Sequence, residues 1–394
     1  MLTLPDDVKK ILETLNGSGH AAYVVGGCVR DGLMGVSPTD WDITTSALPH
    51  EIKTLFKPTI DTGIEHGTVT VVINRRNYEV TTFRIDGQYA DGRRPDSVTF
   101  TDDLVADLSR RDFTMNAIAY NPTSGIADPF CGAADIKNKT IRCVNEPVMR
   151  FSEDALRMMR AIRFAAQLSF NIEEKTYAAI FVIAERLNLI SMERIRDELT
   201  KTLCSANPEK ALMFMDAGLW RHIIRGKNIN CCLENTYLLK NCPKLPALVY
   251  ALLAADKAFM RHLKFDNQTI NETALYCEWL GKNIADDKYE IKKILNKTGP
   301  DKFEKLIKLK TITAPQDITF FKSIAETARG IVSGGECYSL NDLAVSGGDL
   351  INIGVPHGKE VGRVLAALLD KVMAEPDLND REILLRLAAD LLID

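Results

Sequence analysis

The sequence predicts an α+β fold in which a mixed α/β domain is followed by helices alone. Short β-rich runs alternate with helical patterns up to about residue 140, and helical periodicity with few turn signals dominates beyond that point. The chain has 394 residues, more than one hydrophobic core usually holds. We therefore expect several domains, the first of which is α/β.

The N-terminal segment "MLTLPDDVKKILETL" has the apolar spacing of an amphipathic helix. It carries acidic residues early and has no long apolar core, so it is not a signal peptide. The β-rich runs lie at 21–25, 41–45, 68–74 and 78–83, and helical patterns occupy 27–34 and 49–56. We expect these elements to form the α/β domain.

The rest of the chain is predicted to be helical. The segments 151–168, 177–187 and 190–203 are rich in Leu, Ala, Met, Arg and Glu, which favour helices. Turn-forming residues gather at 205–210, 241–246, 296–302 and 313–317. These four breaks predict connections between helices.

Composition excludes several classes of protein. The net charge of −4 argues against a histone-like binder coated in positive charge, and the longest apolar run, "LPALVYALLAA", is too short to span a bilayer. The nine cysteines include no C-x-x-C pair, and Cys231, Cys232 and Cys242 lack zinc-ligand spacing. We expect reduced thiols in a cytoplasmic protein.

Two glycines follow the first β-rich run in "VVGGCVRDGLMGVSPTDWDITTSA", residues 24–47. A turn at Gly26 and Gly27 before a helix directs backbone N–H groups and the positive end of the helix at one place, which suits a phosphate. Arg30, one turn into the helix, can add a guanidinium to the same anion. The alternative is a tight connection that binds nothing.

An Asp-Trp-Asp sequence occupies residues 40–42. Side chains alternate between the faces of a strand, so we expect Asp40 and Asp42 to share one face and Trp41 to point into the core. Paired carboxylates repel unless a cation lies between them, and oxygen ligands beside a phosphate pocket suit Mg²⁺. Glu79, on another β-rich run, is a third candidate. The alternatives are a turn-capping Asp40, a solvated Asp42 and a surface Glu79.

Five long segments stand in the order "GGCVRDGLMGVSPTDWDITTSA", "HGTVTVVINRRNYEVTTFRIDGQYADGRRPDSVTF", "RRDFTMNAIAYNP", "EDALRMMRAIRF" and "LAVSGGDLINIGVPHGKEVGRVLAALLDKV". Together they resemble the motifs of the nucleotidyltransferases that add CCA to tRNA and of their bacterial poly(A) polymerase relatives. The resemblance implies a polymerase-β-like nucleotidyltransferase head at 1–140, a helical neck at 141–207, a body at 208–300 and a tRNA-binding tail at 301–394. It also implies CTP, ATP and tRNA as partners and Mg²⁺ as cofactor, with no membrane association.

The resemblance assigns roles to residues of the head. Asp40 and Asp42 would hold the metal ions that activate the RNA 3′ hydroxyl and steady the leaving pyrophosphate, with Glu79 as a further catalytic candidate. The incoming triphosphate would be bound by Gly27, Arg30 and Arg111. Without the resemblance, Arg110, Arg111 and Asp112 would be interpreted as a surface ion-pair cluster.

The helix predicted at 151–168 carries Asp154 and Arg157, three residues apart on one face, and Arg160 and Arg163 continue its basic row. Such a pair usually forms an exposed salt bridge. The resemblance implies instead that these four residues bind substrate and that Asp154 and Arg157 read the incoming base. A carboxylate accepts from the exocyclic amine of C or A, and a guanidinium donates to cytosine N3 or adenine N1. G and U present the reverse polarity, so one pair selects C and A together without ordering them.

Two further segments bear on function. The segment "RIDGQYADGRRPDSVTF", residues 84–100, predicts a loop that helps the switch from C to A by the resemblance, or a mobile surface loop without a role. Residues 281–310 hold nine lysines against five acidic residues, a balance of +4, which indicates either a solvated face or RNA contact.

Three functions remain as candidates. The first is CCA addition to tRNA, complete or limited to CC or A. The second is a bacterial poly(A) polymerase, which the lack of a basic extension after "EVTTFR" disfavours. The third is a non-catalytic RNA-binding protein, which the aspartates, the glycine turn and the base-reading pair disfavour.

Overall fold

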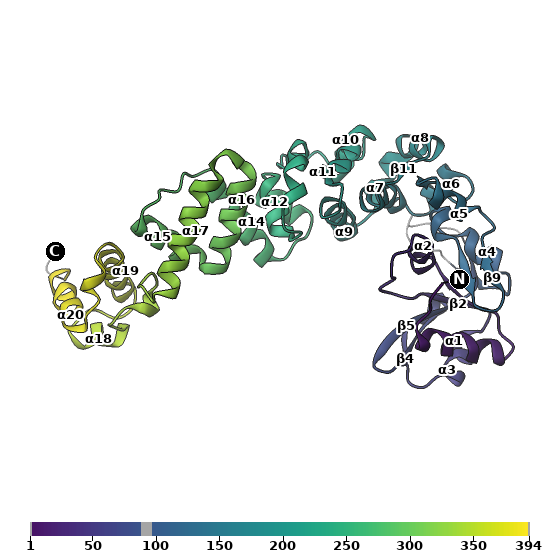
Figure 1. The fold of residues 1–394 in the computed structure, drawn as a ribbon, viewed down its shortest axis with the longest axis horizontal. Coiled ribbons are helices and arrows are strands. Elements are labelled where there is room, and N and C mark those ends of the chain that lie inside the picture. The colour runs from purple at the N-terminus through teal and green to yellow at the C-terminus, as the bar shows by residue number, and fades with distance from the viewer. Residues whose placement is uncertain (1, 88–96, 393–394) are drawn as a thin grey trace. The chain divides into compact units, whose positions relative to one another are not determined.

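The computed structural model of the chain describes residues 2–87 and 97–392. They form two compact units, Met1–Ile229 with Arg261–Phe265 and Asn230–Met260 with Asp266–Asp394, coloured purple to teal and teal to yellow in Figure 1. The chain passes from one unit to the other three times, after Ile229, after Met260 within α13 (Lys257–His262), and after Phe265. The division into head, neck, body and tail stays a prediction.

A seven-stranded mixed sheet forms the centre of the first unit, and its strand order is β3-β4-β5-β2-β1-β8-β9. The β2–β5 pair is parallel and the other pairs are antiparallel. Val24, Ile43, Val69 and Val80 are buried on it, as expected of β-branched residues. The strands are β1 Ala22–Val25, β2 Ile43–Thr45, β3 Thr59–Gly63, β4 Thr68–Ile73, β5 Arg76–Thr82, β8 Ala119–Asn121 and β9 Gly125–Ala127.

The predicted strand at 41–45 is shorter than expected, because β2 begins only at Ile43. Residues 40–42 have no regular secondary structure, so the alternation of faces along a strand does not govern their side chains. Trp41 is accordingly half-exposed, and the prediction that it points into the core is wrong.

Five helices accompany the sheet: α1 Asp6–Gly17, α2 Gly27–Leu33, α3 Pro49–Leu55, α4 Leu104–Ser109 and α5 Gly132–Lys137. The first is amphipathic as predicted and buries Val8, Ile11, Leu12 and Leu15. The carboxylate of Asp7 accepts a hydrogen bond from the Tyr78 hydroxyl at 3.0 Å, which fastens α1 to β5.

The segment 84–100 contains structure that the sequence did not predict. Its ends pair as an antiparallel ribbon, β6 Arg84–Asp86 with β7 Val98–Phe100. The central part of the predicted loop, 88–96, lies outside the described residues.

Helices complete the first unit: α6 Pro147–Glu153, α7 Leu156–Leu168, α8 Glu174–Ile183, α9 Met192–Leu203, α10 Met213–Asp216 and α11 Trp220–Ile224, with the short parallel pair β10 Thr140–Ile141 and β11 Asn171–Ile172. The predicted single helix at 151–168 is broken at Asp154, whose φ and ψ of −139° and 104° are extended. Its carboxylate accepts from the Leu156 amide at 3.0 Å and so begins the next helix.

The second unit is helical, as predicted. Pro246 and Pro300 stand in the first turns of α12 and α16, where a missing amide hydrogen does no harm. Beyond α13, its helices are α12 Pro246–Leu252, α14 Asn267–Leu280, α15 Lys288–Thr298, α16 Pro300–Thr313, α17 Ile318–Ser333, α18 Gly347–Asn352, α19 Lys359–Ala374 and α20 Arg381–Asp390. Among the described helices, none combines the length and apolar character needed to cross a bilayer.

Two of the nine lysines in 281–310 are structural. Lys310 is buried and donates to the Leu280 carbonyl at 2.9 Å and to the Lys282 carbonyl, so it caps the end of α14. Lys292 is 1 % exposed and pairs with Glu336 at 2.9 Å. A role of the remaining lysines in RNA binding stays a prediction.

Packing at the start of α5 leaves no space for a side chain at Gly132. A Cβ there would lie 2.1 Å from the Thr114 carbonyl oxygen. We expect Gly132→Ala to lower the free energy of unfolding by roughly 1–3 kcal/mol because the backbone must move. Urea denaturation followed by circular dichroism measures this change.

Gly17→Ala is the matched control, because no atom lies within 4 Å of its Cβ position. Alanine is the better helix former, so this variant should keep or gain stability, by at most about 1 kcal/mol. Equal stability of both variants would show that the backbone around Gly132 accommodates a methyl group at no cost.

Candidate active site

Three carboxylates lie together at one edge of the sheet. Parallel pairing places Ile43 opposite Val80, so Asp42 and Glu79 each precede a paired residue on neighbouring strands. Asp40 and Glu79 line the same cleft as Asp42, about 920 Å³ in volume. The cleft is lined by Pro5, Pro38, Thr39, Asp40, Trp41, Asp42, Thr62, Thr70, Arg76, Asn77, Tyr78 and Glu79. Trp41 is thus a wall of the cleft.

The charges of these carboxylates are not balanced by neighbours. Within 2–87 and 97–392, the side chains of Asp40, Asp42 and Glu79 form no hydrogen bond and no ion pair. Their tips reach solvent, but partial desolvation in the cleft raises the pKa of Asp42; Arg111 opposes this shift and Asp40 adds to it. Desolvation, then Asp42 and Asp40, raises the pKa of Glu79. Among the described residues, no group of three or more His, Cys, Asp or Glu side chains is arranged to hold a metal ion by itself. A hard divalent cation here would be shared between these carboxylates and a triphosphate.

The glycine turn lies beside the carboxylates, as the sequence predicted. Gly26 has φ 82° and precedes α2, which begins at Gly27. A Cβ at Gly26 would lie 3.0 Å from Nη1 of Arg111. The absence of a side chain at Gly26 therefore lets the Arg111 guanidinium approach the turn.

Arg30, predicted to bind the same anion as the glycine turn, lies behind polar partners, and its role as an anion ligand stays a prediction. It is 9 % exposed, and its guanidinium donates to Asp31 at 2.7 Å and to the Asn116 side chain at 2.8 Å. Nη2 of Arg30 also lies 3.7 Å from the Cβ position of Gly27. The Arg30 guanidinium therefore lies against the glycine turn and already has hydrogen-bond partners.

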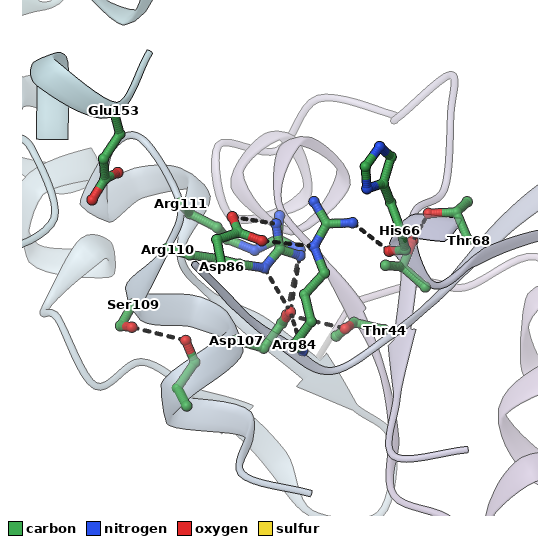
Figure 2. A network of polar contacts seen from close by, with 12 residues as sticks. Thr44, His66, Thr68, Arg84, Asp86, Asp107, Ser109, Arg110, Arg111 and Glu153 are labelled. Carbon is green, nitrogen blue, oxygen red and sulfur yellow. Dashed lines mark hydrogen bonds and ion pairs between the residues drawn. The ribbon is translucent and has the colours of Figure 1, made fainter. Parts of the chain in front are cut away.

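Arg111 lies among buried charges, so the alternative of a surface ion-pair cluster is wrong. Burial lowers the pKa of its guanidinium, and Asp107, 3.9 Å away, opposes that shift. Its Nε is buried and has no hydrogen-bond partner in the described part of the chain. Figure 2 shows Arg111 beside Arg110 and Asp107. A cation with unused donors near Gly26 and Asp42 suits a phosphate group.

Asp154 and Arg157 do not share a helix face, because Asp154 lies between α6 and α7. Asp154 accepts two hydrogen bonds from Arg194, at 2.8 and 3.3 Å. Arg157 is bonded to Glu153 at 2.5 Å and donates to the Arg110 carbonyl at 3.0 Å. The expected common helix face is therefore wrong, and the alternative of a salt bridge between Asp154 and Arg157 does not hold either.

Arg194 and Glu153 are the polar contacts that sequence reasoning missed. Glu153 stands four residues before Arg157, a spacing that could have identified it. Arg194 is 40 residues from Asp154, and no local pattern connects them.

Arg160 and Arg163 lie in the predicted basic row but have carboxylate partners. Arg160 contacts Asp112 at 2.5 Å and Arg163 contacts Glu198 at 2.9 Å. Burial alone would raise the pKa of Asp112, but Arg160 and Asn116 hold it well below its usual range. These arginines thus form ion pairs that link α7 to the segments around the site.

The ring of Phe164 is surrounded by three guanidinium groups. Those of Arg30, Arg160 and Arg163 lie 5.2, 5.3 and 4.3 Å from its centroid, which is the range of cation–π contacts. Phe113 meets the same ring edge-on at 5.8 Å. Phe164 thus connects α2, which carries the glycine turn, with α7.

Comparison with protein families assigns three parts of the chain. Residues 22–142 match the poly A polymerase head domain, and residues 169–227 match an RNA- and SrmB-binding site of polymerase A. Residues 246–388 match tRNA nucleotidyltransferase domain 2. The first match contains the carboxylates, the glycine turn and Arg111.

Curated relatives cover nearly the whole chain. A CCA-adding enzyme of Levilactobacillus brevis is 36 % identical over 98 % of this chain and 99 % of its own length. One of Lactobacillus johnsonii is 39 % identical over 92 % of each chain. The crystal structure of the Bacillus stearothermophilus CCA-adding enzyme in complex with CTP superposes with a TM-score of 0.84, at 33 % identity over 98 % of each chain. This chain belongs to the family of CCA-adding enzymes, which are metal-dependent nucleotidyltransferases.

Proposed function

We propose that this protein adds C, C and A to the 3′ end of tRNA, using CTP and ATP. The observation that carries the proposal is the group of three unpaired carboxylates beside the Gly26 turn and Arg111. Membership of the CCA-adding enzymes supports it. Transfer of a nucleotidyl group needs charge to be neutralised on both the entering and the leaving oxygen.

Asp40 and Asp42 would hold the metal, which we propose to be Mg²⁺, with Glu79 beside them. When bound, Mg²⁺ would supply Lewis-acid stabilisation to the attacking 3′ oxygen and the departing pyrophosphate. Gly27 and the open backbone at Gly26 would receive the triphosphate, and the unused donors of Arg111 would bind its oxygens. Arg30 would bind the triphosphate beside Arg111, with its guanidinium oriented by Asn116.

Selection of the base is assigned to Asp154 and Arg157. The carboxylate of Asp154 would accept from the amine of cytosine or adenine, and Arg157 would donate to the adjacent ring nitrogen. Arg194 fixes the Asp154 carboxylate and Glu153 fixes the Arg157 guanidinium. Arg160 and Arg163 would also bind substrate, and their guanidinium groups are held by Asp112 and Glu198.

We further propose that the head, neck, body and tail follow the divisions expected from sequence, and that the tail contacts tRNA. A protein that recognises folded tRNA would contact phosphates and 2′ hydroxyls. A cytoplasmic location is also proposed, because all nine cysteines are free thiols, as in a reducing compartment.

One assay separates the candidate functions. Purified protein is given a tRNA transcript lacking its 3′ end, with CTP and ATP singly and together, and products are resolved to one nucleotide. Addition of CCA supports the proposal. A-only tails would support a poly(A) polymerase or A-only enzyme, CC without A a partial enzyme, and no incorporation with Mg²⁺ or Mn²⁺ a non-catalytic RNA-binding protein.

The carboxylates give the first activity prediction. Asp40→Ala and Asp42→Ala should each abolish nucleotide transfer and leave tRNA affinity nearly intact, because only charge neutralisation is removed. Asp61→Ala, which removes an exposed carboxylate of β3 paired with Lys53, should behave as wild type. Single-turnover assays and tRNA filter binding measure both quantities. Near wild-type turnover in either cleft variant would refute the metal assignment.

The glycine turn gives a second prediction. Gly26→Ala should weaken binding of both CTP and ATP by at least about tenfold, because the methyl group displaces Arg111 and the positive φ disfavours alanine. Gly35→Ala is the control, since Gly35 has φ 75° and no atom within 4 Å of its Cβ position. It also places alanine at a positive φ, but without the steric clash. Equal nucleotide affinity in the two variants would separate Gly26 from the triphosphate site.

The base-reading assignment gives a third prediction. Asp154→Ala should lower the preference for CTP over UTP by about one to two orders of magnitude, since removing one hydrogen bond or one polar repulsion changes the binding free energy by roughly 1–3 kcal/mol. Arg157→Ala should weaken use of both CTP and ATP. Single-nucleotide incorporation with all four triphosphates measures these ratios.

Asp197→Ala is the control, because it breaks the neighbouring ion pair with Arg196 on α9. It should keep wild-type selectivity. Unchanged C/U and A/G ratios in the Asp154 and Arg157 variants would make both residues structural only.

A further inference from the structure

Asp107 is a fully buried carboxylate to which the mechanism above gives no role. It lies on α4 with 0 % of its surface exposed. Its Oδ1 accepts from the Arg84 amide at 3.3 Å and from Nε of Arg110 at 3.0 Å. Its Oδ2 accepts from the Thr44 hydroxyl at 3.1 Å and faces Nη2 of Arg111 at 3.9 Å. Figure 2 shows these groups converging on one side chain.

The groups around Asp107 come from each segment that carries the site. Thr44 follows Asp42 by two residues on β2. Arg84 begins β6, directly after the strand that carries Glu79. Arg111 reaches the Gly26 turn. One carboxylate thus contacts the metal-binding strand, the neighbouring ribbon and the triphosphate-binding arginine.

The three arginines depend on Asp107 to different degrees. Arg84 also pairs with Asp86 at 3.0 Å and donates to the His66 carbonyl, and Arg110 also lies 4.0 Å from Asp86. Arg111 has Asp107 as its one ion-pair partner among the residues that the structure describes. Its Nε has no partner there either. The orientation of Arg111 therefore depends most on Asp107.

We propose that Asp107 is a positioning residue that holds the Arg111 guanidinium toward the Gly26 turn. The guanidinium is then already oriented when the triphosphate binds. The proposal rests on the proposed function. A long side chain without its partner spreads over several rotamers, and the triphosphate must then restore their order on binding.

Replacement of Asp107 by Asn distinguishes two roles of this residue: orientation of the Arg111 guanidinium, and a purely electrostatic effect of the negative charge. All the groups around the carboxylate are donors, so the amide NH₂ must face one set of them. If the amide oxygen keeps Arg84 and Arg110, the NH₂ group faces Thr44, whose hydroxyl can turn to accept, and Arg111, which cannot. Arg111 is then displaced. A role limited to charge predicts the reverse, since removal of a negative charge makes Arg111 more attractive to phosphate.

The test compares Asp107→Asn with Asp135→Asn. Asp135 is also a buried head carboxylate, and it accepts from the Thr114 hydroxyl at 2.7 Å and from Nε of Arg142 at 3.1 Å, away from the cleft. It therefore controls for the general effect of removing a buried charge. Measured quantities are the KM values for CTP, ATP and tRNA, and the inhibition constant of inorganic pyrophosphate, which probes the phosphate site without a base.

In Asp107→Asn we expect the KM for CTP and ATP and the inhibition constant of pyrophosphate to rise together by about tenfold. The KM for tRNA and the C/U and A/G ratios should be unchanged, and Asp135→Asn should match wild type in all of them. Unchanged or tighter binding of triphosphate and pyrophosphate would overturn the proposal. So would an effect confined to kcat.

Asp107→Glu keeps the inference testable if the Asn variant does not fold. It retains the charge and moves the carboxylate by one methylene, so a positioning role predicts a several-fold rise in the same three constants. Wild-type constants would overturn the proposal. CTP and pyrophosphate binding are also measured without tRNA, so a wild-type protein that adds no nucleotide would defeat the proposed function and leave the Asp107 result readable.

Discussion

The parallel pairing of β2 with β5 is the constraint on which the site depends. It places Asp42 and Glu79 on adjacent segments of the same sheet, with Asp40 close by. Negative charge is thereby concentrated at one edge of the sheet. Elsewhere in the unit the buried carboxylates are matched: Asp112 with Arg160 and Glu198 with Arg163. Charge is left unmatched in the cleft, where a metal and a substrate can balance it.

Local sequence patterns predicted the elements that carry the site. The β-branched runs became strands, and the glycine pair formed the expected turn with Gly26 at positive φ. The predictions for Trp41 and Asp154 were wrong, each for a separate structural reason. A short strand preceded by irregular chain looks like one longer strand in the sequence, which misplaced Trp41. An aspartate that stops one helix and caps the next looks like a helical residue, which misplaced Asp154.

Long-range polar partners could not be predicted. Arg160 meets Asp112 across 48 positions, Arg163 meets Glu198 across 35, and Arg194 meets Asp154 across 40. Periodicity identifies the face on which a charge lies, but the residue opposite is set by how α7 packs against α9 and the head. The sequence therefore predicted which side chains carry charge. The fold determined which of them pair with another side chain and which are left to bind a ligand.

The contacts of Phe164 couple α2 to α7. Arg30 belongs to the helix behind the phosphate turn, Arg160 and Arg163 belong to α7, and one neutral ring lies among all three. An aromatic face attracts several like charges at once without fixing any of them by a hydrogen bond. A substitution in α7 that shifts Phe164 would therefore also disturb Arg30 on α2, so the two helices are expected to tolerate change only together.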